Sequence, residues 1–182
     1  MVFFTAEILP QIRHGGYAAA IFDFSPVISQ TAVFAGGRAV WMFNGRFGIG
    51  GAYHDIISDV NSNFYDTLAM DYSLVQLNYG GMTLEYNYPI NDDLHIGAEI
   101  LLAGGGLKLL PKDKSKPYSD FYGNDFLLWQ PAVNITYKLT SVTRLTLNFG
   151  YRKISDFKPY INHTGDDFSD YSAAIYFRFG EY

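Results

Sequence analysis

The sequence predicts an all-β chain that forms a closed antiparallel up-and-down transmembrane β-barrel of about eight strands. Three observations support this prediction. The 182 residues include 15 Tyr, 15 Phe and 18 Gly but only 17% charged residues, whereas a soluble domain carries roughly 25%. Apolar and polar residues alternate with a period of two along much of the chain, as they do in strands with two different faces. Short connections also alternate with long polar ones, which is typical of barrels that cross a membrane.

Composition also excludes other classes. A membrane helix needs a run of roughly 18 apolar residues or more, and the longest candidate, at 100–103, ends at the glycines 104–106. Cysteine is absent, which excludes a disulfide framework and thiolate metal sites. The net charge of −5 argues against a nucleic-acid partner.

Three strands follow directly from the alternation, at residues 129–137, 144–152 and 171–179. Five more are predicted at 16–24, 31–43, 47–57, 74–88 and 94–109. Two positions indicate irregularities. The strand at 74–88 changes its apolar phase at Gly80-Gly81, so a bulge is expected there. Pro131 lies inside a predicted strand, where its missing N–H removes a ladder hydrogen bond or requires a bulge.

The connections indicate how the strands are arranged. Asn44-Gly45 predicts a type I′ hairpin turn, because both residues tolerate positive φ. The connections at 90–93 and 139–142 are also short, whereas those at 58–71, 111–125 and 155–170 are long and polar. An even number of strands then places both termini and the short turns on the periplasmic side.

The chain is expected to have two parts. Residues 15–182 form the barrel. Residues 1–14 are too apolar for a loose tail, and we expect them to plug the barrel mouth, to lie along the membrane interface or to dock onto another subunit.

Aromatic residues test this orientation independently, because amphipathic rings gather at both surfaces of a membrane. The predicted strands place aromatic side chains near both ends of their outward faces. The residues expected at the two interfaces are Trp41, Phe43, Phe47, Tyr53, Tyr86, Tyr88, Trp129, Tyr137, Phe149, Tyr151, Tyr171, Phe177 and Phe179.

Several short motifs carry a resemblance to a known class. They are GGMTLEY at 80–86, LHIG at 94–97, GGG at 104–106, YRK at 151–153 and YFRF at 176–179. On these residues the chain resembles the small eight-stranded outer-membrane barrels, in particular the barrel proteins of the Bacteroidetes. The resemblance implies a fold and a bacterial outer-membrane location, but no activity. The first residues lack the features of a signal peptide, so we expect the sequence to be a mature form.

The inward face carries the candidate site. Eight strands leave a lumen just wide enough for side chains, and an unpaired buried charge is costly, so charges there should pair. Glu85 and Glu99 are expected to accept hydrogen bonds from Arg38. One or more of Arg144, Arg152 and Arg178 are expected to donate to them as well. An ion-selective path is the alternative. The predicted luminal charge network is Arg38, Arg46, Glu85, Glu99, Arg144, Arg152 and Arg178.

Catalytic and metal chemistry find little support in the sequence. His54, Asp55 and Ser58 near the outer rim suggest a lipid-modifying enzyme, but no spacing places a nucleophile beside an oriented base. The glycines at 48–51 open no helix, which argues against a nucleotide loop. His163 with the carboxylates at 166–167 does not match a calcium loop. We therefore expect no enzyme activity, no cofactor and no metal.

The remaining polar feature is a group of lysines, Lys112, Lys114 and Lys116, in the connection at 111–125. They suit contact with lipopolysaccharide phosphates, although a solvated loop is the simpler explanation. The sequence as a whole predicts a structural, adhesive or scaffolding barrel of the cell envelope. Its expected partners are outer-membrane lipid, lipopolysaccharide and other envelope proteins that meet the N-terminal segment or the long loops. A soluble lipocalin-like barrel that binds an apolar ligand is the alternative from a different class.

Overall fold

The structure is a computed structural model that describes residues 13–67, 70–113, 123–158 and 163–181. Within these residues the chain forms nine β-strands and one short 3₁₀ helix. They are β1 (His14–Val27), β2 (Gln30–Phe43), β3 (Phe47–Ile56), β4 (Asn61–Asp66), β5 (Asp71–Pro89), β6 (Leu94–Pro111), β7 (Gly123–Lys138), β8 (Thr143–Ser155), η1 (Gly165–Phe168) and β9 (Asp170–Glu181). No helix in the described residues is long and apolar enough to span a membrane. Most of the predicted N-terminal segment, residues 1–12, lies outside the described residues.

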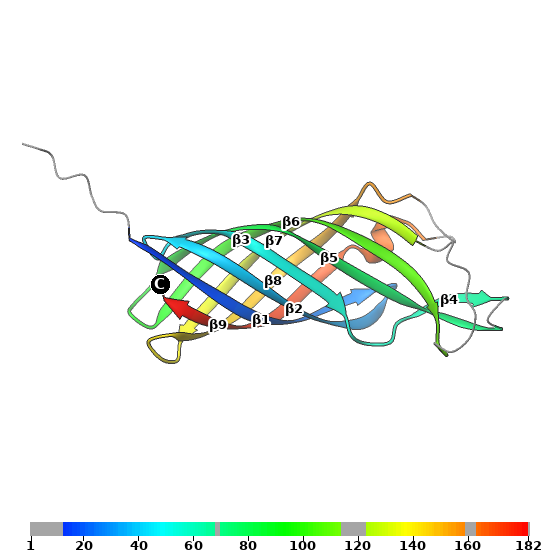
Figure 1. Ribbon diagram of the computed structural model, residues 1–182, viewed down its shortest axis with the longest axis horizontal. Helices are drawn as coiled ribbons and strands as arrows, with labels where there is room; N and C mark the ends of the chain where they lie inside the picture. The colour runs from blue at the N-terminus through cyan, green and yellow to red at the C-terminus, as the bar shows by residue number, and fades with distance from the viewer. Residues whose placement is uncertain (1–12, 68–69, 114–122, 159–162, 182) are drawn as a thin grey trace, which may run out of the picture.

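Eight of the strands close into a barrel. The order runs β3-β2-β1-β9-β8-β7-β6-β5, and an additional pairing between β3 and β5 joins the two ends. All of these pairs are antiparallel. Figure 1 shows the strands inclined to the long axis of an elongated barrel, with β4 projecting at one end and the C-terminus at the other. The predicted fold class is therefore confirmed.

The two ends of the barrel differ. One end holds the C-terminus and the short turns at 44–46, 90–93 and 139–142, and we call it the turn side. The opposite end, the loop side, holds β4 and η1, which lie in connections predicted to be irregular. Neither element has a clear period-two or helical pattern of its own, so the sequence did not indicate them.

Tight turns with positive φ connect neighbouring strands on both sides. Asn44 (φ 52°) and Gly45 (φ 64°) form the predicted type I′ turn, and the Arg46 N–H donates to the Phe43 carbonyl oxygen at 3.0 Å. A second turn joins β1 to β2 through Ile28 (φ 49°) and Ser29 (φ 59°). A β-branched residue rarely adopts positive φ, so this turn was not predictable from residue type.

The predicted bulge at Gly80-Gly81 is wrong. β5 pairs with β6 without a register shift from Ser73 to Pro89. The buried residues of β5 are odd-numbered both before and after the two glycines. The strand therefore keeps its phase, and what changes at the glycines is the chemistry of its two faces.

This change reverses the inside-outside pattern along β5. On the turn side the inward residues are Thr83, Glu85 and Asn87, and the outward residues are Met82, Leu84 and Tyr86. Between residues 75 and 79 the inward residues are Val75, Leu77 and Tyr79, and the outward residues are Gln76 and Asn78. A barrel surrounded by lipid has an apolar exterior, whereas a barrel surrounded by water has an apolar interior and a polar exterior. The loop side of β5 therefore has the pattern of a water-exposed domain.

Other strands contribute to the same apolar interior. We call it the outer apolar layer, and its buried residues include Val27, Phe34, Val60, Val75, Leu77, Leu107, Leu109, Phe126, Leu128, Ile154 and Phe168. Phe168 comes from η1 and Val60 from the connection before β4. The loop-side elements therefore pack over the end of the barrel.

Pro131 interrupts the pairing of β7 with β8. The ladder has a gap between the pairs Trp129–Lys153 and Ala132–Gly150, because proline has no N–H to donate. Both strands have the same number of residues in the gap. The interruption is thus a local loss of pairing and not a bulge.

Close approach of β5 to β6 makes Gly81 a test of the barrel geometry. A Cβ at Gly81 would lie 2.0 Å from the Leu102 carbonyl oxygen and 2.5 Å from the Ala103 Cα. At Gly104 the nearest atom would be the Phe126 carbonyl oxygen at 3.9 Å. Gly81→Ala should therefore lower the free energy of unfolding by roughly 1–3 kcal/mol, and Gly104→Ala should change it much less. Urea unfolding of the barrel refolded into lipid vesicles measures both, and equal effects would contradict this geometry.

Candidate functional site

Four charged side chains from four strands meet inside the barrel on its turn side. We call Arg38 (β2), Glu85 (β5), Glu99 (β6) and Arg178 (β9) the luminal ion-pair cluster. Arg38 Nη1 donates to Glu99 Oε2 at 2.8 Å, and Arg38 Nη2 lies 3.4 Å from Glu85 Oε2. Arg178 Nη1 donates to Glu85 Oε1 at 3.3 Å. The four side chains are at most 6% exposed.

The register explains why these charges are needed together. Glu85 and Glu99 are direct cross-strand partners, and like charges in that position repel each other. Arg38 contacts both carboxylates, so it offsets the repulsion that the strand pairing creates. The cluster has two positive and two negative charges and is neutral as a unit.

Tyrosine and asparagine side chains complete the carboxylate contacts. Tyr17 donates its hydroxyl to Glu85 Oε2 at 2.6 Å, and Asn87 Nδ2 donates to Glu85 Oε1 at 3.0 Å. The Tyr176 hydroxyl donates to Glu99 Oε1 at 3.0 Å. Hydrogen bonds to ionised groups are stronger than neutral ones, so these donors hold the carboxylates in fixed positions.

The arginines also have partners besides carboxylates. Arg38 Nη2 donates to Thr83 Oγ1 at 2.7 Å. The Arg38 guanidinium lies 5.1 Å from the Tyr176 ring centre, and that of Arg178 lies 4.6 Å from the Tyr17 ring centre. Sequence reasoning had not assigned Thr83 or the two tyrosines to the site. Thr83 lies two residues from Glu85 and Tyr176 lies two residues from Arg178, so the period of two places both on the inward face and could have indicated them.

A second polar group lies between the ion-pair cluster and the outer apolar layer. The His54 ring stacks on the Tyr79 ring with centroids 4.8 Å apart and an interplanar angle of 11°. His54 Nδ1 lies 3.9 Å from Asp23 Oδ2, and Gln130 Nε2 donates to Ser172 Oγ at 2.9 Å. All five residues are buried, so polar side chains fill this part of the lumen as well.

The other predicted members of the network lie elsewhere. Arg152 is fully buried, but it donates to the carbonyl oxygens of Pro26 at 2.8 Å and Phe168 at 3.0 Å. It therefore ties β8 to the end of β1 and to η1. Arg144 is half-buried opposite Arg178. The inward placement of Arg46 is wrong, because this residue belongs to the β2–β3 turn and is exposed.

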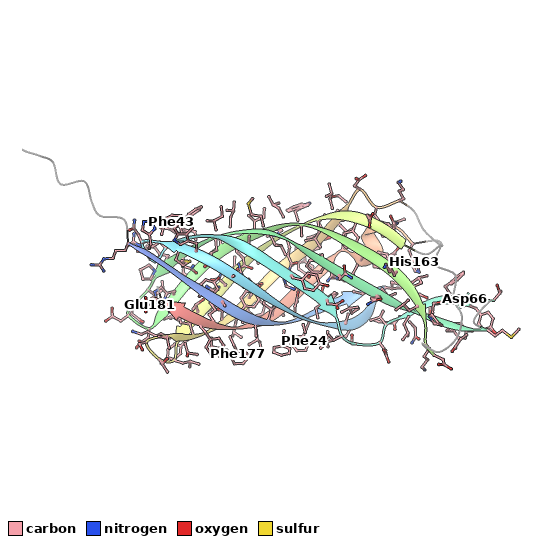
Figure 2. All side chains as sticks on the ribbon, in the orientation of Figure 1. Phe24, Phe43, Asp66, His163, Phe177 and Glu181 are labelled. Atoms are coloured by element: carbon pink, nitrogen blue, oxygen red, sulfur yellow. The ribbon has the colours of Figure 1, made fainter. Side chains whose placement is uncertain are left out.

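The predicted interface aromatics all belong to the outward face. Eleven of the thirteen are exposed, and Phe43 and Tyr151 are half-buried. Figure 2 shows Phe24, Phe43 and Phe177 projecting from the barrel wall, with His163 and Asp66 at the loop side and Glu181 at the turn side. So many exposed aromatic rings need a non-aqueous neighbour. That this neighbour is the membrane interface stays a prediction.

The residues considered for catalysis do not converge. His54 is buried inside the barrel and is only 3% exposed, whereas Asp55 follows it on the opposite face of β3. Ser58 Oγ accepts a hydrogen bond from the Val33 N–H at 2.9 Å. The buried His54 and the outward Asp55 are therefore not arranged as a base and its orienting partner, as nucleophilic chemistry requires.

The candidate loop-side groups have ordinary structural contacts. His163 Nε2 lies 3.2 Å from the Ser62 carbonyl oxygen, and its Nδ1 lies 3.7 Å from Asp167 Oδ2. In the described part of the chain no group of three or more His, Asp or Glu side chains is arranged to hold a metal ion. Lys112 is exposed, and Lys114 and Lys116 lie outside the described residues.

Removal of one carboxylate tests the ion-pair cluster. Glu85→Gln should lower the free energy of unfolding by roughly 3–5 kcal/mol, because Arg38 and Arg178 then lose a buried counter-charge. Glu181→Gln, at an exposed position, should leave stability nearly unchanged. Urea titration of the variants in lipid vesicles measures the difference. If both variants unfold at the same urea concentration, the cluster does not stabilise the barrel.

Comparison with known proteins agrees with this architecture. No family model matches the sequence, and no curated protein matches it in sequence. Among solved structures it is similar to the N-terminal β-barrel domain of Pseudomonas aeruginosa OprF, with a TM-score of 0.62 and 10% identity over 93% of this chain and 99% of that one. It is also similar to Neisserial surface protein A (TM-score 0.61, 10% identity, 94% and 98% covered). A third is Ail, the attachment invasion locus protein of Yersinia pestis (TM-score 0.57, 8% identity, 92% and 97% covered). The chain thus has the fold of the small eight-stranded outer-membrane β-barrels.

Proposed function

We propose that this chain is an integral barrel of the bacterial outer membrane, with a lumen filled by side chains, that serves as a surface-exposed adhesive or scaffolding component of the cell envelope. The observation that carries the proposal is the reversal of the inside-outside pattern along the strands. An apolar exterior over a polar interior is the pattern of a barrel in lipid. The opposite pattern on the loop side is that of a barrel standing in water.

Strand length supports a part that projects from the membrane. A strand needs roughly 9–11 residues to cross, but β5 has 19, β6 has 18 and β7 has 16. The surplus lies on the loop side, where the outer apolar layer and η1 form a packed extension. A rigid platform held above the membrane suits contact with other cells or envelope proteins better than it suits transport.

The filled lumen argues against a pore. The luminal ion-pair cluster, the polar residues around His54 and the outer apolar layer follow one another along the lumen. An ion would have to displace buried side chains at each of these levels. The ion-path alternative therefore has no support from the described residues.

A soluble lipocalin-like barrel fits the arrangement less well. Such a protein would enclose an apolar cavity and expose polar groups along its whole length. Here the exposed outward residues of the turn-side half include Trp41, Ile49, Tyr86, Ile96 and Phe177. The apolar interior of the loop side is occupied by its own packed side chains.

Enzyme activity is also disfavoured by position. The burial of His54 separates it from any lipid substrate outside the barrel. We therefore keep the non-enzymatic assignment as part of the proposal.

The similarity to Ail supports an attachment role only through the name of that protein. One Ail structure contains the heparin analogue sucrose octasulfate. The net charge of −5 in the present chain argues against transferring a polyanionic ligand. Kinship with Bacteroidetes barrels and docking through residues 1–14 stay part of the proposal and rest on the sequence motifs and on the apolar character of that segment.

Cysteine labelling tests both membrane insertion and orientation, because the chain has no cysteine of its own. Thr67→Cys lies beside β4 on the loop side, and Asp92→Cys lies in a turn-side connection; both positions are exposed. A maleimide too large to cross the outer membrane should label Thr67→Cys on intact cells. It should label Asp92→Cys only after the membrane is permeabilised. Labelling of both on intact cells, or recovery of the protein without detergent, would contradict the proposal.

A further inference from the structure

The outer wall of the barrel carries several hollows, and one of them lies among large aromatic rings. It is an apolar groove of about 620 Å³ across β7, β8, β9 and β1. The residues that shape it are Phe24, Pro131, Phe149, Tyr151, Tyr171 and Ala173. We call it the wall groove. It faces away from the lumen, so its contents come from the surroundings of the barrel.

The strand register shows how the groove forms. Ala173 on β9 pairs with Phe149 on β8 and with Phe24 on β1. A small side chain therefore lies between two large rings on the outward face. One step nearer the loops, Tyr151 pairs with Tyr171, and their rings lie 5.1 Å apart at an interplanar angle of 69°. These rings wall the groove at its loop-side end.

Pro131 extends the floor of the groove. It lies in the gap of the β7–β8 ladder, and its compact ring leaves more room than the neighbouring outward residues Trp129 and Val133. A Cβ at Gly150 would lie 2.9 Å from the Pro131 carbonyl oxygen, so the two strands lie close together under the groove. The hollow is therefore built by residue size and backbone geometry at fixed positions.

The position of the groove decides which molecule reaches it. It lies in the apolar part of the wall, below the paired tyrosines, and tyrosines of this kind mark the level of lipid headgroups. It also lies at the end of the apolar exterior that is nearer to the loop side, and in the proposed orientation this end of the lipid-facing wall meets the outer leaflet. Hydrocarbon of outer-leaflet lipid is thus the material in contact with it.

Charge supports a phosphorylated headgroup above the groove. Lys153 is two residues beyond Tyr151 on the same outward face of β8, about 7 Å farther toward the loops. Its ammonium contacts Asp166, whose side chain is 81% exposed. The lysine therefore offers a positive charge at headgroup level, held by an exposed partner that a phosphate can replace.

We propose that the wall groove binds one acyl chain of lipopolysaccharide, with Lys153 contacting a phosphate of its lipid A headgroup. The inference rests on the proposed outer-membrane location. Because lipid and protein are equally apolar here, retention comes from van der Waals packing in the hollow and from the headgroup charge. The site would fix one lipid on the β7–β9 side of the barrel.

A substitution that fills the hollow tests the proposal. Ala173→Phe places a ring between Phe24 and Phe149, whereas Ala39→Phe is a matched control on the outward face, where its cross-strand neighbours are Ala18 and Gly51. Each protein is inserted into vesicles that contain lipid A and phosphatidylethanolamine, extracted in mild detergent and analysed by native mass spectrometry. Vesicle flotation before extraction reports membrane insertion separately.

The expected result is one lipid A retained by the wild type and by Ala39→Phe, and a several-fold lower retention by Ala173→Phe. Lys153→Gln should reduce the preference for lipid A over phosphatidylethanolamine. Three outcomes would overturn the proposed lipid site. They are insertion of the wild type without lipid A retention, equal retention of both lipids by the wild type, and equal lipid A retention by Ala173→Phe and Ala39→Phe. Failure of the wild type to float with the vesicles would instead overturn the proposed function.

Discussion

Closure of the sheet is the constraint on which the rest of this structure depends. Backbone N–H and C=O groups inside a bilayer have no water to bond with, so a strand there needs a partner on both edges. The β1–β9 pairing joins the first and last strands of the chain, and the β3–β5 pairing closes the remaining gap in the strand order. Once eight strands close, the lumen is narrow, and every inward side chain must fit and bond within it. The luminal ion-pair cluster follows from this restriction, since Glu85 and Glu99 are forced into direct opposition and need Arg38 between them.

The same strands serve two solvents. On the turn side β5 has apolar residues outside and polar residues inside, which suits the proposed lipid surroundings, whereas beyond the glycines the order is inverted without any change in strand phase. Arg152 lies at this transition, where its guanidinium binds two backbone carbonyls and faces Phe34 at 4.9 Å. It links the polar lumen to the outer apolar layer. The result is a continuous barrel whose projecting end is stabilised in the manner of a soluble core.

Small residues have a different role on each face of the wall. Inside and between strands, Gly81 allows two backbones to approach within distances that a side chain would prevent. Outside, Ala173 and Pro131 leave a hollow among aromatic rings. Residue type alone does not distinguish these roles, because both depend on which neighbours the register brings to the position.

The sequence by itself determined the barrel class, the eight barrel strands and the Asn44-Gly45 turn, because a period of two and turn chemistry are local properties. It also determined that Arg38, Glu85, Glu99 and Arg178 face inward. The alternation also led to two errors. Arg46 was placed inside the barrel although it belongs to a turn, and a change in the chemistry of the two faces at Gly80-Gly81 was taken for a change of strand phase. Only the tertiary structure decided that Arg178 meets Glu85 while Arg152 bonds the backbone of Pro26 and Phe168. The height at which each side chain lies in the lumen depends on the stagger of the strands around the closed barrel. This stagger is set by the pairing of all the strands, so it cannot be predicted from the sequence of one strand.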